Sequence, residues 1–196
     1  MSTTLLIGAT SAMAEHTARA LAADGDDLLL AAPDPERLKV LADDLRTRGA
    51  AEVDILPAFD AADPGGTRAL LDHLQRREGA IDHILTAHGH LPDQAACEQD
   101  PDAAARELEI NFTSAVRLCT ALGNLLADQG HGTLAVISSV AGLRGRQSNY
   151  IYGAAKGGLN VFLQGLRNRL FPKGVRVVTL LPGFVDTPMT ADIEKG

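Results

Sequence analysis

Short apolar runs alternate along the chain with longer segments in which apolar residues recur at helical spacing. Runs of this length that are apolar at nearly every position are typical of strands buried on both faces of a parallel sheet. The longer segments show the three- and four-residue spacing of amphipathic helices, as Leu38, Leu41 and Leu45 do. The predicted strands are Thr3–Ile7, Asp27–Ala32, Val53–Phe59, Ile81–Ala87, Thr133–Ser138 and Val175–Leu181.

The segments between these strands predict helices and one long loop. Because strands and helices alternate, we expect an α/β fold: a Rossmann-like doubly wound parallel sheet with helices on both faces. No linker or repeat divides residues 1–196, so we expect a single domain. The pattern lacks the last edge strand of such a sheet, which predicts a C-terminal truncation. The predicted helices are Ala12–Ala23, Glu36–Arg48, Pro64–Arg77, a long one within Asp102–Asp128, and Tyr150–Phe171, and the polar loop is Gly89–Asp100.

Composition and charge then narrow the class of protein. The chain is 45% hydrophobic and 22% charged, as globular proteins are, and its net charge is −7. An acidic balance without a basic block argues against nucleic acid or an anionic membrane as the main partner. No apolar run approaches the ~18 residues that a membrane span needs. The two cysteines, Cys97 and Cys119, are too few for a disulfide scaffold, so we expect a reduced, cytoplasmic compartment.

The turn after the first strand has the context of a dinucleotide site. Gly8 follows the strand directly, and a helix opens a few residues later, so a pyrophosphate could sit on the helix N-terminus. The hydroxyls of Thr10 and Ser11 could add hydrogen bonds. Ala12 and Ala14 stand where further glycines would be expected, and an ordinary strand–helix connection would look much the same.

The choice between NAD and NADP stays open at this level. An acid at the end of the second strand would select NAD, and a nearby arginine would suit the 2′-phosphate of NADP. Ala32 and Pro33 hold those places, followed by Asp34, whose reach is uncertain. Asp60, after the third strand, could bind the adenine amino group, or could equally be a helix N-cap or loop carboxylate.

A catalytic constellation follows the fifth strand. Tyr152 and Lys156 are four residues apart on a predicted helix, and therefore lie on one face, one turn apart. Ser139 ends the fifth strand, at the edge where a parallel sheet presents ligands. Reduction of a ketone needs a proton for the oxygen. A tyrosine could supply it if a nearby ammonium and a positive nicotinamide lowered its pKa from ~10.

These residues resemble the signature of the short-chain dehydrogenase/reductase superfamily. The matching runs are Ser138-Ser139-Val140-Ala141-Gly142, Tyr152-Gly153-Ala154-Ala155-Lys156 and Pro182-Gly183-Phe184-Val185-Asp186-Thr187. The likeness implies an NAD(P)-dependent oxidoreductase in which Ser139 positions the carbonyl, Tyr152 is the acid–base, and Lys156 also binds the nicotinamide ribose. It further implies that Asn111 supports a proton-relay water. The cofactor residues implied by the turn and the likeness are Gly8, Thr10, Ser11, Met13, Asp60, Ala87, Gly89, Tyr152, Lys156, Pro182, Gly183, Val185 and Thr187.

The chain departs from the family pattern in two places. The family's glycine-rich turn, Thr-Gly-x-x-x-Gly-x-Gly, is here Ile7-Gly8-Ala9-Thr10-Ser11-Ala12-Met13-Ala14. Its Asn-Asn-Ala-Gly motif after the fourth strand is here Thr86-Ala87-His88-Gly89. Family members also continue into a substrate lid. The Gly-Ala-Thr-Ser start and the loop 146–149 are similar to reductases of the decaprenylphosphoryl-2-keto-ribose type. Gln147 and Asn149 could contact a polar substrate, although a solvated loop is the more ordinary interpretation.

The histidines near the fourth strand and the arginines of the loop after the fifth strand need no functional explanation. His83, His88 and His90 lie close in sequence, but metal binding would need convergent geometry and a further ligand, so we expect no metal site. Arg144 and Arg146 could pair with a substrate phosphate, although loop arginines are common. In the family, the helices around 103–126 and 150–171 form a dimer bundle, so the likeness implies a homodimer or homotetramer.

Together these observations predict an enzyme that moves a hydride between NAD(P)(H) and a small-molecule carbonyl/alcohol substrate. The alternative from another class is a catalytically silent nucleotide-binding regulatory or scaffold protein. Such a protein would need none of Ser139, Tyr152 and Lys156, so their joint presence favours the enzyme.

Overall fold

The computed structural model describes residues 2–190 and shows one six-stranded sheet, all of whose neighbouring strands are parallel. The strand order is β3-β2-β1-β4-β5-β6. Strands β2 and β3 lie on one side of β1, and β4, β5 and β6 lie on the other, as in a doubly wound sheet. The predicted fold class is therefore confirmed. The strands are β1 (Thr3–Ile7), β2 (Asp27–Ala31), β3 (Val53–Ile55), β4 (His83–Thr86), β5 (Gly132–Ile137) and β6 (Val175–Leu180).

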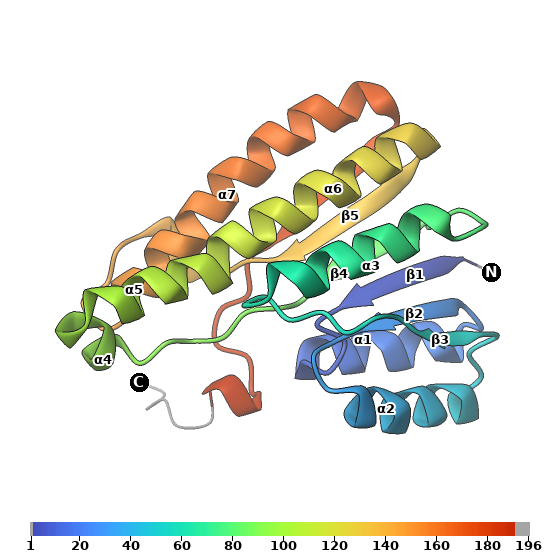
Figure 1. The fold of residues 1–196 in the computed structure, drawn as a ribbon, viewed down its shortest axis with the longest axis horizontal. Coiled ribbons are helices and arrows are strands. Elements are labelled where there is room, and N and C mark those ends of the chain that lie inside the picture. Colours follow the sequence, from blue (N-terminus) through green and yellow to red (C-terminus); the bar gives the residue numbers. More distant parts are fainter. Residues whose placement is uncertain (1, 191–196) are drawn as a thin grey trace.

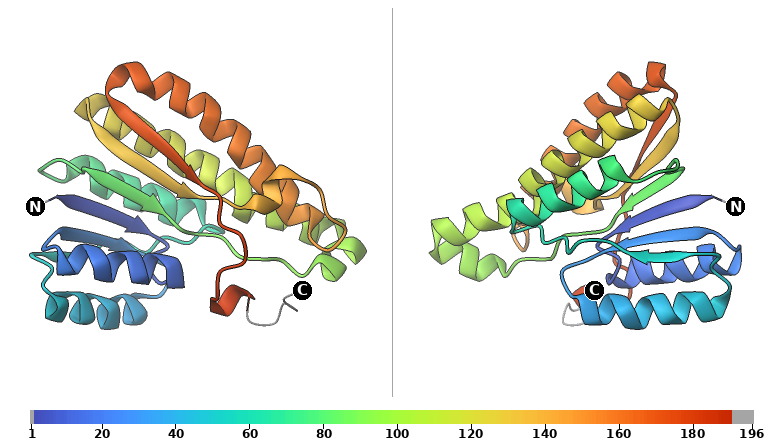
Figure 2. Two further views of the ribbon diagram at one scale, coloured as in Figure 1. Left: turned by 180° about the vertical axis from the view of Figure 1, so that it is seen from behind. Right: turned by 45° about the vertical axis from the view of Figure 1, so that its right-hand side comes forward.

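Helices lie on both faces of this sheet (Figures 1 and 2). Helices α1 and α2 cover one face beside β1 and β2, while α3, α6 and α7 cover the other. The α-helices are α1 (Ala12–Ala23), α2 (Pro35–Arg48), α3 (Pro64–Arg76), α4 (Gln94–Gln99), α5 (Pro101–Leu108), α6 (Ser114–Gln129) and α7 (Tyr150–Leu170). Single turns of other helix types occupy Glu109–Thr113, Val140–Leu143, Phe171–Lys173 and Pro188–Thr190.

The alternation of side chains along each strand divides the core into two clusters. Leu5 and Ile7 of β1 pack with α3, α6 and α7, whereas Leu6 between them packs against α1 and α2. Neighbouring residues of a strand point to opposite faces, so a strand covered on both sides is apolar throughout. Alanines such as Ala18 line the buried face of α1, and their small side chains let this helix lie close to the sheet.

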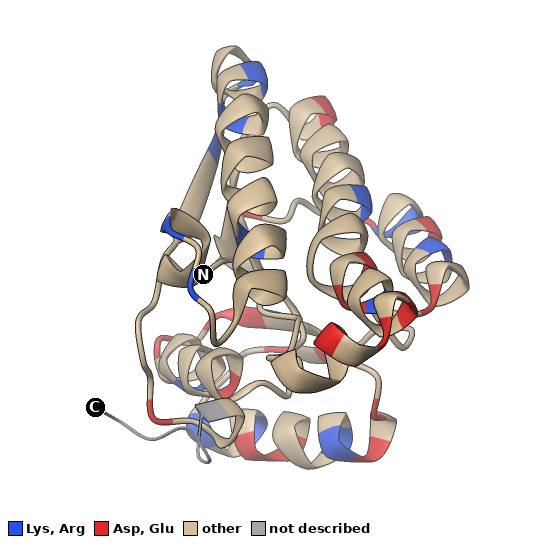
Figure 3. Cartoon of the chain, turned by 90° about the vertical axis from the view of Figure 1, so that its left-hand side faces the viewer, with Lys and Arg blue, Asp and Glu red and all other residues tan. Residues whose placement is uncertain are grey.

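Several helices begin after an aspartate whose carboxylate accepts hydrogen bonds from the first backbone N–H groups. The carboxylate of Asp34 accepts from the backbone N–H groups of Glu36 and Arg37, and Pro35 occupies the first turn of α2. Asp63 caps α3 in the same way. Charges of both signs alternate along α2 at the bottom of Figure 3, where Arg46 pairs with Asp43.

The structure corrects the interpretation of residues 89–129 in two places. The segment predicted as a polar loop contains a short helix, α4, whose start is capped by Asp93. The long helix expected within Asp102–Asp128 is interrupted by a π-helical turn over Glu109–Thr113, which separates α5 from α6. Single π turns within helices often occur at functional sites. Among residues 2–190, no helix is both long and apolar enough to cross a bilayer.

Candidate active site

A cavity of about 380 Å³ opens at the carboxyl ends of β1, β4, β5 and β6, where parallel sheets bind their ligands. It gathers most of the predicted site residues from distant parts of the chain. Gly8, Asp60 and Asn111 do not line it. The predicted residues that line it are Thr10, Ser11, Met13, Ala87, Gly89, Ser139, Tyr152, Lys156, Pro182, Gly183, Val185 and Thr187.

Tyr152 and Lys156 lie on α7, one turn apart, as their spacing predicts. The Lys156 side chain is buried, with 4% of its surface exposed, and its Nζ lies 5.6 Å from the centre of the Tyr152 ring. The ammonium donates to the carbonyl oxygen of Ile137 at 3.4 Å. Burial lowers the pKa of Lys156 to about 8, so the side chain stays mainly protonated at neutral pH.

Ser139, the last residue before the turn that follows β5, lines the same cavity as Tyr152, and its hydroxyl accepts from the N–H of Ala141 at 3.1 Å. Burial raises the pKa of Tyr152, and the nearby Ser139 hydroxyl acts in the opposite direction but is the weaker effect. The protein groups alone therefore raise the pKa of Tyr152, and its lowering by Lys156 together with a positively charged nicotinamide stays a prediction.

A buried hydrogen bond fixes the segment after β5, which carries Ser139, to the helix that carries Tyr152. The Ser138 hydroxyl donates to Oδ1 of Asn160 at 2.6 Å, and it also reaches the carbonyl oxygen of Lys156 at 3.4 Å. Ser138 and Asn160 are both at least nine-tenths buried. Because β5 and α7 are joined here, the three candidate catalytic side chains are held in one arrangement. Sequence spacing alone did not point to Asn160, although it lies one turn after Lys156.

Asn111 lies in the π-helical turn, behind the cavity, and is 2% exposed. Its Nδ2 donates to the carbonyl oxygen of Glu107 at 3.2 Å and to the Glu107 carboxylate at 3.3 Å. Its Oδ1 accepts from the backbone N–H of His90 at 3.1 Å, and the His90 ring contacts the same carboxylate at 2.9 Å. Glu107 therefore orients the Asn111 amide, with its oxygen toward the loop after β4. Its position four residues before Asn111 was the one signal in the sequence.

The turn after β1 and the loop after β4 form the floor of the cavity beside α1. A glycine in each of them allows the two segments to approach closely. Gly8 has φ +74°, and a Cβ there would lie 2.8 Å from the backbone nitrogen of His88. Gly89 has φ +128°, and a Cβ there would lie 2.9 Å from Oδ1 of Asn111. Ser11 caps α1 by accepting from the N–H of Ala14 at 3.3 Å. Side chains at Gly8 and Gly89 would therefore collide with neighbouring atoms, and the two glycines keep these segments close together. They lie beside the N-terminus of α1, which suits a pyrophosphate.

Two acidic residues that the sequence places near a bound cofactor, Asp34 and Asp60, accept hydrogen bonds from the protein backbone instead. Oδ1 of Asp34 accepts two backbone N–H groups at the start of α2, so the carboxylate serves as the helix cap. Asp60 is exposed, and its Oδ1 accepts from the N–H of Ala62 at 2.8 Å. For Asp60 this geometry favours the loop-carboxylate interpretation. Among residues 2–190, histidines, cysteines and acids do not form a group of three that could hold a metal ion.

His88 stands where the family pattern has a small residue, and its side chain joins the loop after β4 to α6. The Ser114 hydroxyl donates to the Ile110 carbonyl oxygen at 2.6 Å, so Nε2 of His88, 3.1 Å from that hydroxyl, is the donor between them. This leaves Nδ1 unprotonated and buried, with no partner among residues 2–190. Burial, and secondarily the Lys156 charge, lowers the pKa of His88 to about 3.

We expect His88 to make the protein sensitive to acid. Its pKa is about 3 when folded and about 6.5 when unfolded, so below pH 6.5 the unfolded state binds the extra proton. The free energy of unfolding therefore falls as the pH drops from 6.5 toward 3, by at most about 1.4 kcal/mol per pH unit from this group. Urea denaturation between pH 7 and pH 4 measures the slope. A His88→Asn variant should show a smaller slope, and an equal slope would contradict the assignment.

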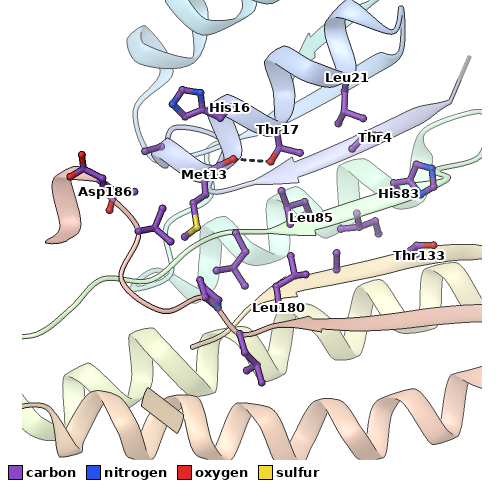
Figure 4. A pocket seen from close by; sticks show the side chains of 18 residues that line it. Thr4, Met13, His16, Thr17, Leu21, His83, Leu85, Thr133, Leu180 and Asp186 are labelled. Atoms are coloured by element: carbon purple, nitrogen blue, oxygen red, sulfur yellow. Dashed lines mark hydrogen bonds between the residues drawn. The ribbon is translucent and has the colours of Figure 1, made fainter. Parts of the chain in front are cut away.

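A second, larger cavity of about 780 Å³ lies between α1 and strands β4, β5 and β6 (Figure 4). It adjoins the first, with which it shares Met13, Val185 and Thr187 among others. Its lining is mainly apolar, as Leu85 and Leu180 illustrate, and it includes none of Ser139, Tyr152 and Lys156. The candidate acid–base chemistry therefore belongs to the smaller cavity.

The parallel sheet, the nucleotide floor at α1 and the Ser/Tyr/Lys set together define a class of protein, the nicotinamide-dependent oxidoreductases. A family model described as short chain dehydrogenase matches residues 2–196, and the chain belongs to that family. It is accordingly an NAD(P)-dependent oxidoreductase. The particular branch suggested by the loop 146–149 stays a prediction.

Three known proteins illustrate the likeness. An uncharacterized oxidoreductase of the mprA 5′ region of Streptomyces coelicolor is 43% identical over 187 residues, covering 95% of this chain and 73% of that protein. A bulky-bulky ketone specific alcohol dehydrogenase from Comamonas testosteroni superposes with TM-score 0.86 at 28% identity, over 96% of this chain and 74% of the other. A short-chain dehydrogenase from Sphingobium yanoikuyae in complex with NADPH gives TM-score 0.85 at 28% identity, with the same coverage.

Proposed function

We propose that the chain moves a hydride between NAD(P)(H) and a carbonyl/alcohol pair on a small molecule. In this proposal Tyr152 is the acid–base, Ser139 orients the carbonyl and Lys156 supplies the buried positive charge. The observation that carries the proposal is that these three side chains, from the segment just after β5 and from α7, meet in one cavity that also reaches the N-terminus of α1. Proximity and orientation of this kind are what acid–base catalysis requires.

The chemistry of reduction follows from the state of each side chain. When bound, the reduced nicotinamide supplies the hydride that adds to the carbonyl carbon and is itself oxidised. Tyr152 donates its phenolic proton to the carbonyl oxygen as the C=O π bond breaks, which gives the alcohol. Its raised pKa keeps that proton in place at neutral pH. Ser139 donates to the same oxygen, and the Lys156 cation stabilises the phenolate left behind.

Around this centre the remaining predicted residues would bind the cofactor and resupply the proton. We assign the pyrophosphate to the N-terminus of α1 with Thr10 and Ser11, and the nicotinamide end to the segment Pro182–Thr187, which lines the same cavity. Asn111, oriented by Glu107, would support the water that returns a proton to Tyr152.

The test is carbonyl-dependent oxidation of the reduced cofactor. The purified protein is titrated with NADPH and NADH by nicotinamide fluorescence, and ketones are then added while the absorbance of the reduced cofactor is followed. Binding together with ketone-dependent oxidation supports the proposal. Binding without oxidation across a broad ketone panel would contradict it and favour a silent nucleotide-binding protein.

Arg37 favours NADPH over NADH as the cofactor. It lies in the first turn of α2, lines the cavity and donates to the carbonyl oxygen of Thr10 at 3.1 Å. An arginine near the end of the second strand suits the adenosine 2′-phosphate. Its side chain is 61% exposed, and it also pairs with Glu15 at 3.5 Å.

We therefore expect Arg37→Gln to weaken NADPH binding about tenfold, the usual effect of losing a charge-assisted hydrogen bond, while NADH binding barely changes. Fluorescence titration with both cofactors measures this. Arg46→Gln, on the same helix but outside the cavity, is the control. Equal losses for the two cofactors in Arg37→Gln would overturn the preference.

The assembly and compartment are part of the same proposal. The family likeness of α6 and α7 suggests a homodimer or homotetramer, which light scattering of the purified protein would measure. Cys97 and Cys119 are both buried free thiols, consistent with a reducing, cytoplasmic environment.

A further inference from the structure

The cavity that contains Tyr152 is lined by basic side chains and, within residues 2–190, by no acidic one. Its charged lining residues are Arg37, Arg146 and Lys156, and none of the others is an aspartate or a glutamate. His88 also lines it, but the pKa of its ring is lowered to about 3, so the ring is neutral. The cavity is thus positive in a chain whose net charge is −7. A cleft lined by charges of one sign attracts ligands of the other.

Two of these three cations already have a role in the proposed function. Lys156 is buried beside the ring of the candidate acid–base. Arg37 lies in the first turn of α2 and donates to the carbonyl oxygen of Thr10, at the end of the cavity assigned to the adenosine. Arg146 has no such role. It belongs to the loop between β5 and α7, six residues before Tyr152, so it approaches the cavity from the side of the candidate catalytic residues.

The structure separates Arg146 from its polar neighbours in this loop. Arg144 and Arg146 are both exposed, but only Arg146 lines the cavity. Gln147 and Ser148, which follow it, line a different, shallow depression beside α4. The position of Arg146 at the cavity is therefore not a property of the loop as a whole.

The guanidinium of Arg146 is available to a ligand. Among residues 2–190 it has no hydrogen-bond or ion-pair partner, whereas Arg19 and Arg106 pair with acids. The backbone of Arg146 is held next to α7, because its carbonyl oxygen accepts from the N–H of Asn149 at 3.2 Å. A long side chain that is anchored at the cavity and is otherwise unpaired can bind an anion there without breaking an existing ion pair.

We propose that Arg146 selects the substrate by binding an anionic group, a carboxylate or a phosphate, that the substrate carries near its carbonyl. This inference rests on the proposed function and names its substrate class: anionic ketones in preference to neutral ketones with the same carbon skeleton. The planar guanidinium binds either anion through two parallel hydrogen bonds. The carbonyl of the same molecule then lies in the cavity that contains Ser139 and Tyr152.

The experiment compares each anionic ketone with a neutral partner. Levulinate is paired with methyl levulinate, in which the ester removes the charge, and hydroxyacetone phosphate is paired with hydroxyacetone. Values of kcat/KM with saturating NADPH are measured for the wild type and for Arg146→Gln, and the readout is the change in the anionic-to-neutral ratio. We expect Arg146→Gln to lower this ratio about tenfold for at least one pair, mainly through KM, and the pair affected identifies the anion.

The same loop provides a matched control. Arg144→Gln removes an identical charge outside the cavity, so it should leave both ratios unchanged. Arg146→Lys keeps the charge but not the forked donors, and should retain part of the preference. Thermal unfolding identifies variants that fail to fold. Unchanged ratios in a folded Arg146→Gln overturn the inference, as does an equal fall in Arg144→Gln. A tenfold loss of NADPH binding in Arg146→Gln would place this arginine at the cofactor and would also overturn it.

Binding measured without turnover separates this inference from the proposed function. Levulinate and hydroxyacetone phosphate are titrated into the protein–NADPH complex, and the nicotinamide fluorescence is followed. Anion binding that weakens about tenfold in Arg146→Gln, with no ketone reduced, supports the anion site and contradicts the proposed function. Reduction of the neutral ketones with no preference for the anionic ones supports the proposed function and overturns the anion site. If the wild type neither binds nor reduces any of the four, both are overturned.

Discussion

Replacing Tyr152 by phenylalanine should lower kcat at least about a thousandfold while NADPH binding stays nearly intact. The change removes one hydroxyl group and keeps the ring that packs beside Lys156. Without the phenol, no protein group at this position can donate a proton to the carbonyl oxygen, and acid–base catalysis is worth about 10²–10⁴ in rate. Cofactor oxidation with a reactive ketone measures the loss, and nicotinamide fluorescence measures binding in the same preparation.

The chain offers a matched control for this substitution. Tyr150, its only other tyrosine, begins the same helix two residues earlier and is 43% exposed. Tyr150→Phe removes an identical hydroxyl group outside the cavity, so its activity should stay within about twofold of the wild type, as for most surface changes. Wild-type turnover by Tyr152→Phe would refute the proposed acid–base role. Loss of activity in both variants would place the effect in the stability of the helix rather than in proton transfer.

The fold could be predicted because its information is local. Strands buried on both faces must be apolar at every position, so runs such as Leu28–Ala31 identify themselves, and Asp34 with Pro35 marks a helix start. The helix α4 was missed because its six residues hold only one buried side chain, Cys97, too few to produce a periodic pattern. The π-helical turn at Glu109–Thr113 could not be recognised in the hydrophobic pattern. A π turn adds one residue to a helical turn and needs no particular residue type.

Only those parts of the candidate site could be predicted that follow from the spacing of residues or from a sequence motif. Four residues of separation place Tyr152 and Lys156 on one face, and the cavity contains both. Contacts between distant segments are invisible in the sequence, such as the cap that Gln94 gives to α7. The pKa of Tyr152 depends on information of the same kind: the sequence shows a lysine nearby, but not where its ammonium points or how deeply the phenol is buried.

The second large effect is expected at Gly142, in the turn between β5 and the loop that leads to α7. This turn lies directly on the backbone of α7. A Cβ at Gly142 would come within 2.6 Å of the Gly157 nitrogen and of the Lys156 carbonyl carbon. Both atoms belong to the backbone of a helix and cannot move aside as a flexible side chain would. An added methyl group must therefore push the turn away from α7, and with it Ser139 away from Tyr152.

We expect Gly142→Ala to lower the free energy of unfolding by about 3 kcal/mol, the upper part of the range for overpacking, and to lower kcat/KM by at least about tenfold. Gly145→Ala is the control, because apart from its two chain neighbours no described residue has an atom within 4 Å of a Cβ at that position. Urea denaturation and cofactor-coupled ketone reduction measure the two effects. Equal stability of the two variants would show that α7 and the turn can separate without cost. Full activity in a destabilised Gly142→Ala would show that Ser139 need not stay in register with Tyr152.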